Sequence, residues 1–333
     1  MNETQKSPSP PRLIPALVAG FDAITNHIVL ILFPVAIDLF LWLGPHLRLK
    51  SVIEVYLRDM SAMMLRQSAE LGDMLATNQE VWEVIAQRFN LLSALRSFPV
   101  GIPSLMAGLL PVETPLGAPQ MVDVPSLGWG ILQYALLTIL GLVLGALYFR
   151  LVSQAATQDR LRWVAALRAW PRLGLQVVLL ALIWALLLLV ISVPAFCIIT
   201  FIGLIGISFM QLGILLYGGF LVWLIFPLLF SPHGIFIKDL NAWKSIRHGV
   251  RITSATLPTT SLFFLSVFVI TQGLDLLWRV PPENSWLLLI GLAGHAFVAT
   301  GLLSASFIYY RDANSWVESM IQQVVRSSSD STA

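Results

Sequence analysis

The chain has 333 residues, of which 57% are hydrophobic and only 11% are charged, and its mean hydropathy is +0.80. Because soluble domains carry about 25% charged residues, this composition excludes a soluble globular enzyme, a disordered chain and a nucleic-acid-binding protein. The formal net charge of +2 is too small to indicate a class of partner. The single cysteine, Cys197, excludes a disulfide framework and a metal cluster built on cysteines.

The N-terminal region predicts a polar tail followed by a first membrane span. Residues 1–12 are polar and rich in proline, which predicts a disordered tail. The apolar segment 13–43 is longer than the roughly 20 residues that a helix needs to cross a bilayer. It is also too long for a signal peptide, and no small-residue cleavage site follows it. We therefore expect residues 13–43 to form the first transmembrane helix.

A long hydrophilic segment, residues 44–126, separates the first span from the second. Apolar residues at helical spacing predict two amphipathic helices in this insert. The apolar positions are Ile53, Leu57, Met60 and Met64 in the first helix and Val81, Ile85, Phe89 and Leu92 in the second. Prolines from Pro99 to Pro125 then break regular structure. The methionines of the insert suit a soft-metal or ligand surface, but a small helical hairpin packed on itself or on the bilayer is favoured.

The rest of the chain supplies further apolar segments of membrane-spanning length. They are Leu127–Phe149, the stretch from Leu173 to Phe230 divided near Cys197–Gly206, Leu257–Leu277 and Trp286–Tyr309. The sequence therefore predicts an all-α polytopic membrane protein with six transmembrane helices and an extracytoplasmic helical insert. Residues 127–312 form a five-helix membrane core in this prediction, and residues 313–333 form a cytoplasmic tail.

The positions of lysine and arginine predict an orientation. Placing the N-terminus in the cytoplasm puts most of the 20 basic residues on the cytoplasmic side, in the termini and in two short loops. Aromatic-aromatic-arginine triplets ending at Arg150 and Arg311 fall on the same side, where rings favour the headgroup layer. We therefore expect a multi-pass protein of a bacterial or archaeal cell membrane, with both termini in the cytoplasm.

The two basic loops share a pattern that predicts interfacial elbow helices at about 158–172 and 236–252. Cationic side chains three to four residues apart, with Trp and Leu between them, suit anionic lipid headgroups. The headgroup-binding candidates are Arg168, Arg172, Lys244, Arg247 and Arg251. The matching spacing is consistent with a duplicated unit of an elbow and two spans. It is equally what any two cytoplasmic elbows would share, so both interpretations stay open.

One stretch supports a family resemblance. The sequence FPLLFSPHGIFIKDLNAWKSIRHGVRIT resembles the membrane domain found upstream of glycerophosphoryl diester phosphodiesterase catalytic domains, and related multi-pass bacterial and archaeal families. The helix of that pattern matches residues from Ala242 to Arg247, and the resemblance covers roughly 225–312. Because no segment is large enough to hold the phosphodiesterase domain, the resemblance implies a membrane fold and no activity.

Ionisable residues within the spans are the candidates for chemistry, because burying a charge in a bilayer is costly. Asp22 and His27 lie near the cytoplasmic end of the first span, where water reaches them, whereas Asp38 lies in its outer half. A proton relay through Asp38 needs a partner, and His295 and Asp275 are the choices. The simpler interpretations are helix packing for Asp38 and His295 and a local ion pair from Asp275 to Arg279, four residues on.

Function is therefore divided between two classes. The sequence has no nucleophile, phosphate-binding or zinc motif, so we expect no enzymatic activity, no cofactor and no metal. A non-enzymatic membrane module, either a scaffold or a regulator that binds lipid or a membrane-protein partner, is narrowly favoured. The alternative is a permease for an ion or a small, hydrophobic or lipid-like substrate, with Asp38, His295 and Asp275 as its ligand-binding residues. The expected partners are the bilayer, its anionic headgroups and a second membrane protein or copy of the chain, and not nucleic acid.

Overall fold

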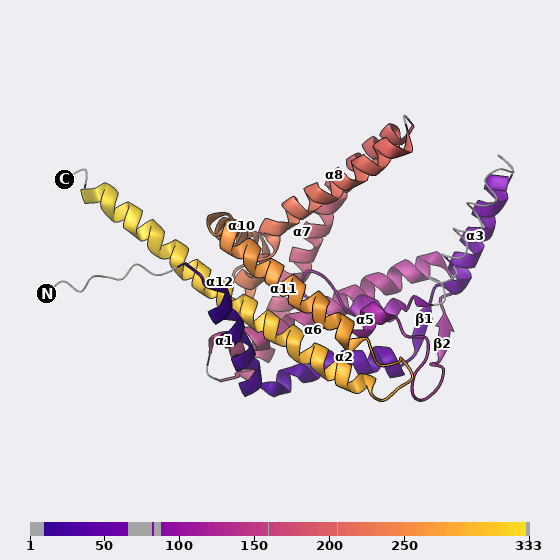
Figure 1. Ribbon diagram of the computed structural model, residues 1–333, viewed down its shortest axis with the longest axis horizontal. Coiled ribbons are helices and arrows are strands. Elements are labelled where there is room, and N and C mark those ends of the chain that lie inside the picture. Colours follow the sequence, from indigo (N-terminus) through magenta and orange to yellow (C-terminus); the bar gives the residue numbers. More distant parts are fainter. Residues whose placement is uncertain (1–9, 66–81, 83–87, 159, 205, 331–333) are drawn as a thin grey trace.

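The computed structural model describes residues 10–65, 82, 88–158, 160–204 and 206–330. Across these residues the chain is helical except for loops and one small sheet, in which β1 (His46–Arg48) pairs in parallel with β2 (Met121–Asp123). Long helices run between two ends of the molecule (Figure 1). We call the end where α1 begins and α12 finishes the terminal side, and the end that carries β1, β2 and α3 the insert side.

Five helical segments among the described residues are long and apolar enough to cross a membrane. They belong to α6 (Leu127–Thr157), α7 (Trp163–Gly203), α8 (Ile207–Ile225) with the short helices after it, α11 (Leu257–Trp278) and α12 (Leu288–Asp330). A bent pair of helices near the N-terminus brings the number to six if the pair is counted as one span. The predicted all-α polytopic fold is therefore confirmed, as is the division of the 173–230 stretch, because α7 ends at Gly203 and α8 begins at Ile207.

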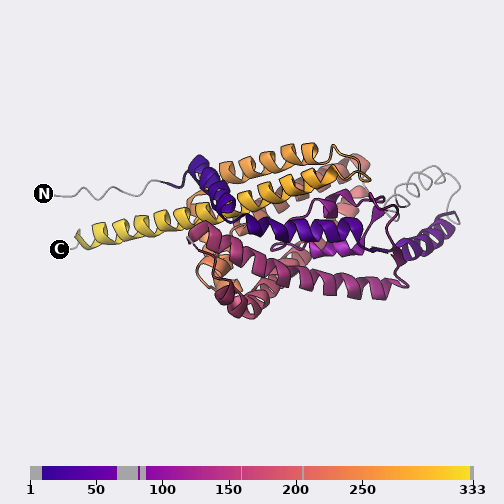
Figure 2. The same cartoon turned by 90° about the horizontal axis from the view of Figure 1, so that it is seen from below.

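The first span is not the single helix expected over 13–43. It consists of α1 (Leu13–Asn26), the 3₁₀ turn η1 (Ile28–Ile31) and α2 (Leu32–Leu43), and the two halves are bent by 92°. His27 lies at the bend with non-helical backbone angles, φ −131° and ψ 47°. Figure 2 shows α1 crossing α12 near the terminal side, and the crossing is close because a side chain at Gly20 would overlap the backbone of Ala305.

Part of the insert packs against the membrane helices, which the hydrophilic average of 44–126 did not predict. We call residues 91–110 the wedge; it contains η3 (Leu91–Leu95) and α5 (Met106–Leu109). Its apolar side chains are buried against α2 and α6. Gly141 and Gly145 of α6 allow this contact, since a Cβ at either position would overlap wedge backbone. The two glycines thus permit a close approach between α6 and the wedge.

The remainder of the insert is described only in part. Helix α3 (Lys50–Leu65) confirms the first of its two predicted amphipathic helices and projects from the insert side (Figure 2). The second was expected around Val81, Ile85 and Phe89, most of which lies outside the described residues. The described chain resumes at 88, and Leu92 falls in η3, a 3₁₀ turn. The side chains of Met60, Met63, Met64 and Met74, proposed as a metal or packing surface, also lie outside them.

The two predicted elbows differ from each other. The second is a separate helix, α10 (Ala242–Ala255), which follows α9 (Ser231–Ile237) and precedes α11. The first was expected as a separate interfacial helix over 158–172, and this is wrong. Helix α7 begins at Trp163 and continues through Pro171 without a break, so Arg168 and Arg172 belong to its first turns. A proline in the second or third turn removes one backbone hydrogen bond but does not end this helix.

Most of the region predicted as a cytoplasmic tail, residues 313–333, is helical. Helix α12 continues past the apolar span to Asp330 without interruption. Its apolar part begins at Leu288, two residues after the predicted Trp286. Near the terminal side, α12 packs against the start of the described chain, where Pro11 and Arg12 lie beside Asp312 and Trp316. The helix therefore links the membrane core to a polar extension.

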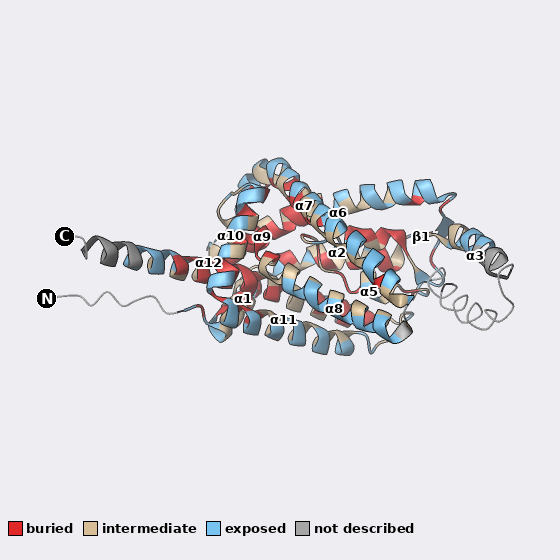
Figure 3. Cartoon of the chain, turned by 90° about the horizontal axis from the view of Figure 1, so that it is seen from above, coloured by how far each residue is buried: buried red, intermediate tan, exposed pale blue. Residues whose placement is uncertain are grey.

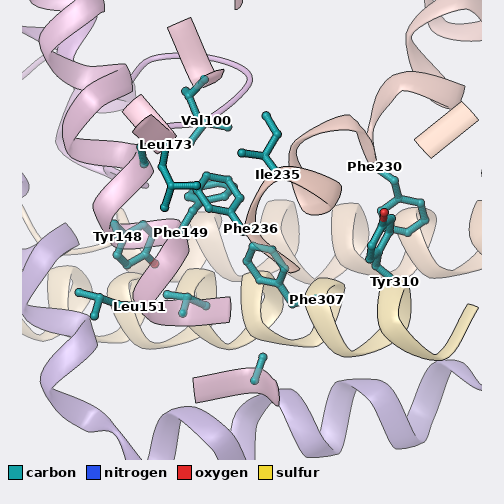
Figure 4. Close-up of a cluster of buried hydrophobic side chains, with 14 of the residues drawn as sticks. Val100, Tyr148, Phe149, Leu151, Leu173, Phe230, Ile235, Phe236, Phe307 and Tyr310 are labelled. Carbon is teal, nitrogen blue, oxygen red and sulfur yellow. The ribbon is translucent and has the colours of Figure 1, made fainter. Parts of the chain in front are cut away.

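The buried core lies where α6, α9 and α12 meet. Phe149 of α6 packs against Phe236 of α9 and Phe307 of α12, with ring centroids 5.6 and 6.0 Å apart (Figure 4). By contrast, α8 buries none of its most apolar stretch within the chain (Figure 3). An apolar helix with no protein cover is suited to contact with lipid tails. The fold thus has a packed half built on α12 and an outlying hairpin, α7–α8.

Candidate functional site

Asp38 is fully buried in the middle of α2 and is held by the wedge. One of its carboxylate oxygens, Oδ1, accepts hydrogen bonds from the Ser104 hydroxyl at 2.5 Å and the Met106 backbone N–H at 2.9 Å. The Ser104 hydroxyl oxygen in turn accepts a hydrogen bond from the N–H of Ala107 at 3.0 Å. A carboxylate that accepts two hydrogen bonds at one oxygen is fixed in position, and its second oxygen, Oδ2, points elsewhere.

His295 on α12 faces that second oxygen. Its Nδ1 lies 3.9 Å from Oδ2 of Asp38, and its Nε2 lies 3.8 Å from Oδ1 of Asp275 on α11. Asp275 lies 3.7 Å from Arg279, which confirms the predicted local pair. The structure therefore brings the three predicted ligand-binding residues, Asp38, His295 and Asp275, into one row. We call Asp38, His295, Asp275 and Arg279 the insert-side row.

The contacts between neighbouring groups in the insert-side row are longer than hydrogen bonds. Nitrogen and oxygen atoms bond at about 2.7–3.2 Å, and both gaps around His295 exceed this range. Oδ2 of Asp38 and Nδ1 of His295 are both buried without a hydrogen-bond partner. Buried polar atoms are nearly always satisfied, so an unpaired acceptor beside an unpaired ring nitrogen is unusual.

The solvent exposure of the side chains increases steadily along the insert-side row. The exposed fraction of the side chain is 0% for Asp38, 7% for His295, 19% for Asp275 and 38% for Arg279. The row therefore leads from a buried carboxylate in the membrane region to a solvent-accessible cation near the α11–α12 loop.

Two residues of the site were missed by sequence reasoning. Arg96 donates from Nη1 to the carbonyl of Ser104 at 3.2 Å, and its charge acts on both Asp38 and His295. Both Arg96 and Ser104 belong to the wedge, which the sequence assigned to an external insert. Position in the sequence gave no signal for them. A retrospective hint is that Ser104 stands in an apolar run, Ile102–Met106, that is suited to burial.

The other polar residues of the first span do not join this site. His27 is at the bend, where its Nδ1 lies 2.9 Å from the carbonyl of Ala23 on its own helix. Asp22 is exposed on α1. The expectation that these two residues lie in reach of water, apart from Asp38, is consistent with this placement.

A second group of polar side chains lies at the terminal end of α12. The hydroxyl of Tyr310 lies 2.8 Å from Nδ1 of His248, and Nζ of Lys238 lies 3.4 Å from its Nε2. Lys238 also donates to Asn314 at 3.0 Å and to Glu318 at 2.6 Å. We call these five residues the terminal-side cluster. It joins α10 and the end of α9 to three successive turns of α12.

Two histidines outside the spanning segments have pKa values below the ordinary 6.5. Burial lowers the pKa of His248, and the neighbouring charge of Lys238 lowers it further. Burial likewise lowers the pKa of His46, which bonds through Nε2 to the carbonyl of Leu41 at 3.1 Å. Both imidazoles therefore remain neutral to a lower pH than a free histidine. In its neutral form His248 can accept a hydrogen bond from Lys238.

The five predicted headgroup-binding cations are all exposed. They are Arg168 and Arg172 near the start of α7 and Lys244, Arg247 and Arg251 on α10. The two helices are joined where the side-chain oxygen of Gln176 accepts the N–H of Ala242 at 2.9 Å. Arg247 lies 4.9 Å above the exposed ring of Trp243. These residues form one cationic rim with an aromatic anchor, on the terminal side.

Comparison of the chain with protein-family models, with curated proteins and with solved structures found no match. The resemblance of residues 225–312 to the membrane domain of glycerophosphoryl diester phosphodiesterases therefore stays a prediction.

Proposed function

We propose that this protein is a proton-linked membrane permease for a small, hydrophobic or lipid-like substrate. The observation that carries the proposal is the insert-side row, in which α2, α11 and α12 contribute ionisable groups that lead from a fully buried carboxylate to an exposed arginine. Ionisable residues inside membrane helices are rare and costly, and they commonly mark substrate or proton pathways. Asp38 and His295 are the proposed proton-binding pair.

The mechanism follows from the gap between these two residues. One oxygen of Asp38 is anchored by the wedge, so the other is the atom free to bind a proton. His295 stands between Asp38 and Asp275 and carries a proton from the more exposed carboxylate to the buried one. When His295 is protonated, both neighbouring carboxylates attract it, which closes the gaps and pulls α2, α11 and α12 together. Loss of the proton releases them.

Two features of the backbone support alternating access. The first span is bent by 92° at His27, and the wedge brings non-helical chain against the spans. Broken helices and irregular chain at membrane depth are tolerated where they line a cavity or lie buried in protein, and transporters use them at their binding sites. Here both features adjoin Asp38, because α2 follows the bend and the wedge supplies the hydrogen-bond donors to its carboxylate.

The orientation is part of the proposal. Assigning the cationic rim to the cytoplasm satisfies the positive-inside rule and places both termini there. The insert then faces the outside of a bacterial or archaeal cell membrane, and so does the exposed end of the insert-side row. Protons enter from the outside, where Arg279 and Asp275 are accessible.

The rim favours a second function, a module that binds anionic lipid. Exposed cations flanking Trp243 on α10 suit a headgroup layer, and each contributes about 1 kcal/mol of attraction near an anionic surface. This alternative needs no buried ionisable row. The permease is preferred because a lipid-binding scaffold offers no reason to retain Asp38 and His295 as unpaired neighbours.

The proposal is tested by proton transfer in proteoliposomes made from lipids of the expression host, so that a lipid-like substrate is present. A pH gradient is imposed, and a trapped dye reports its decay, with potassium and valinomycin clamping the voltage. We expect the protein to accelerate the decay and both Asp38→Asn and His295→Gln to abolish the acceleration. Asp22→Asn is the matched control, because it makes the same change at an exposed position in the other half of the bent span. Its rate stays at that of the wild type.

An independent reading comes from pH-difference infrared spectroscopy of the same samples. The wild type and Asp22→Asn show a buried carboxyl band that changes with pH, and Asp38→Asn lacks it. If all four proteins dissipate the gradient equally and show the same bands, the permease proposal is wrong and the lipid-binding module is the better account.

A further inference from the structure

Two arginines converge beside the proton-binding pair. Arg96 of the wedge and Arg279 after α11 both reach Gly108 in the wedge. A Cβ built on Gly108 would lie 3.1 Å from Nη2 of Arg279 and 3.5 Å from Nη1 of Arg96. Since glycine has no side chain, the two guanidinium groups share this space with nothing between them from residue 108. Two cations so close repel each other unless a negative group lies between them.

The fixed negative charge nearby is already engaged. Asp275 pairs with Arg279 and faces His295, and Oδ1 of Asp38 accepts its two wedge donors. Among the described residues, the ion pairs include no carboxylate bound to Arg96, whose Nη1 bonds instead to the Ser104 carbonyl. With both carboxylates ionised and His295 neutral, these five groups balance. Once His295 takes up a proton, they carry one uncompensated positive charge.

We propose that Arg96 and Arg279 form an anion-binding site that takes a single carboxylate or phosphodiester group together with the proton on His295. This inference rests on the proposed function and names its substrate class, an amphiphile with one negative charge. Arginine presents a planar fork that matches the two oxygens of such groups. Apolar neighbours of the site, including Trp278 packed on Gly294, suit the rest of an amphiphile.

Proton and anion binding are then coupled. The protonated His295 supplies the positive charge that the anion neutralises, so each ligand strengthens the binding of the other by the same factor. The titratable and charged groups that face His295 are Asp38 on α2, Asp275 and Arg279 on α11, and Arg96 in the wedge. The anion and the proton together carry no net charge, so their joint transfer across the membrane avoids the cost of moving a charge through the bilayer.

The same chemistry has two sources, a free acid and the headgroup of a membrane lipid, and the experiment separates them. The protein is placed in nanodiscs of phosphatidylcholine, and octanoate binding is measured by calorimetry at about pH 6 and about pH 8, on either side of the ordinary histidine pKa and above that of a free fatty acid. Octanol serves as the uncharged probe. A second arm adds phosphatidylglycerol to the nanodiscs and measures the lipid retained by native mass spectrometry.

We expect one of the two anions to bind about tenfold more tightly at the lower pH, within the usual range of coupling between sites. Arg96→Gln and Arg279→Gln abolish this binding, and Arg279→Lys weakens it because the fork is lost. His295→Gln keeps the anion site but removes its pH dependence. Arg88→Gln is the matched control, because Arg88 is an exposed arginine on the insert side that pairs with Glu283 at 3.2 Å.

Several outcomes overturn the inference. One is binding of octanoate no tighter than octanol, with no phosphatidylglycerol retained at either pH. Another is unchanged binding in both arginine variants. If either occurs while Asp38→Asn still loses its infrared band, the proton-linked permease stands and only the anion site is wrong. If the band is absent from the wild type, the permease proposal itself fails.

Discussion

The insert-side row and the terminal-side cluster each hold a histidine among polar side chains and both involve α12, yet they are built differently. Around His295, the two distances to carboxylate oxygens are 3.9 and 3.8 Å, and buried atoms remain unpaired. Around His248, Tyr310 lies at 2.8 Å and Lys238 at 3.4 Å. In the proposed function the first arrangement lets protons redistribute, whereas the hydrogen bonds of the second hold its groups in place. Distance, and not residue type, separates a candidate functional site from a structural one here.

The difference follows from what each group joins. The terminal-side cluster ties α10 and the end of α9 to α12 with closed hydrogen bonds, so it stabilises the packing of consecutive elements. The insert-side row spans α2, α11 and α12, but its groups face each other at 3.8 and 3.9 Å without hydrogen bonds. These contacts therefore contribute little to the stability of the fold. Substitutions in the two groups should therefore separate stability from proton transfer.

The largest expected effect tests the packing of the wedge that holds Asp38 in the insert-side row. A side chain at Gly145 of α6 would lie 2.9 Å from the Cα of Gly101 in the wedge, where backbone atoms cannot move aside cheaply. Gly145→Leu should therefore destabilise the protein by about 3 kcal/mol and displace the donors to Asp38. The check is the yield of monodisperse protein and its thermal midpoint in detergent.

Gly218→Leu on α8 is the matched control for that change. A Cβ at Gly218 meets no atom within 4 Å, and the position is exposed on an apolar helix. The variant should behave as the wild type. Equal loss of yield in both variants would mean that the wedge is not seated against α6 as described.

The next largest effect sets the two groups against each other directly. Tyr310→Phe removes a buried hydroxyl that pairs with His248, and such a loss costs about 1 kcal/mol. Its thermal midpoint should fall by about 2–4 °C, the scale for a chain of a few hundred residues, with proton transfer unchanged. Asp38→Asn should show the reverse, because asparagine still accepts from Ser104 and Met106 but cannot bind a transferable proton.

A loss of proton transfer in Tyr310→Phe, or a large fall in the melting temperature of Asp38→Asn, would remove the distinction between the two groups. Both variants are measured in the same detergent and lipid, so that differences in solubilisation do not enter.

Much of this architecture is predictable from the sequence, because apolar length alone identifies membrane helices. The ends of α11 and the division between α7 and α8 were placed within a few residues. The bend at His27 was not, since no proline or glycine stands at the break and the polar residues Asn26 and His27 alone do not predict one. The continuity of α7 through Pro171 was missed for the opposite reason, because proline normally signals a helix boundary.

The site itself was predictable only in part. Asp38, His295 and Asp275 stand out because charges are rare in membrane helices, and this anomaly is local in the sequence. Their wedge partners, Arg96 and Ser104, lie in a segment whose average composition is hydrophilic. Only the packing of that segment against α6 brings them to α2, and such a contact between distant parts of the chain leaves no periodic signal.

The pH dependence of stability offers a smaller effect that belongs to the terminal side. The pKa of His248 is lower in the folded protein than its ordinary 6.5, chiefly through burial and then through Lys238. The unfolded chain therefore binds more protons below about pH 6.5, and stability falls as the pH drops through that value. The charged neighbours that tune this response are Lys238, Glu318 and Arg251.

His248→Gln should flatten the fall in thermal midpoint between about pH 7 and about pH 5, where an unperturbed histidine takes up its proton. Part of the slope should remain, because His46 also has a lowered pKa and contributes with the same sign. His46→Gln removes that part. A slope that neither variant changes would show that these imidazoles do not report on folding.

The smallest expected effect concerns the outer edge of the terminal-side cluster. Lys238 and Glu318 approach within 2.6 Å, the shortest ion pair of the described residues, yet the Glu318 side chain is 55% exposed. Exposed ion pairs contribute about 0–1 kcal/mol, since solvent screens them and two side chains lose freedom. Glu318→Gln should therefore shift the thermal midpoint far less than Tyr310→Phe, measured in the same buffer. Equal shifts would place the stability of the cluster in its exposed charges; the structure places it in the buried hydroxyl of Tyr310 and its bond to His248.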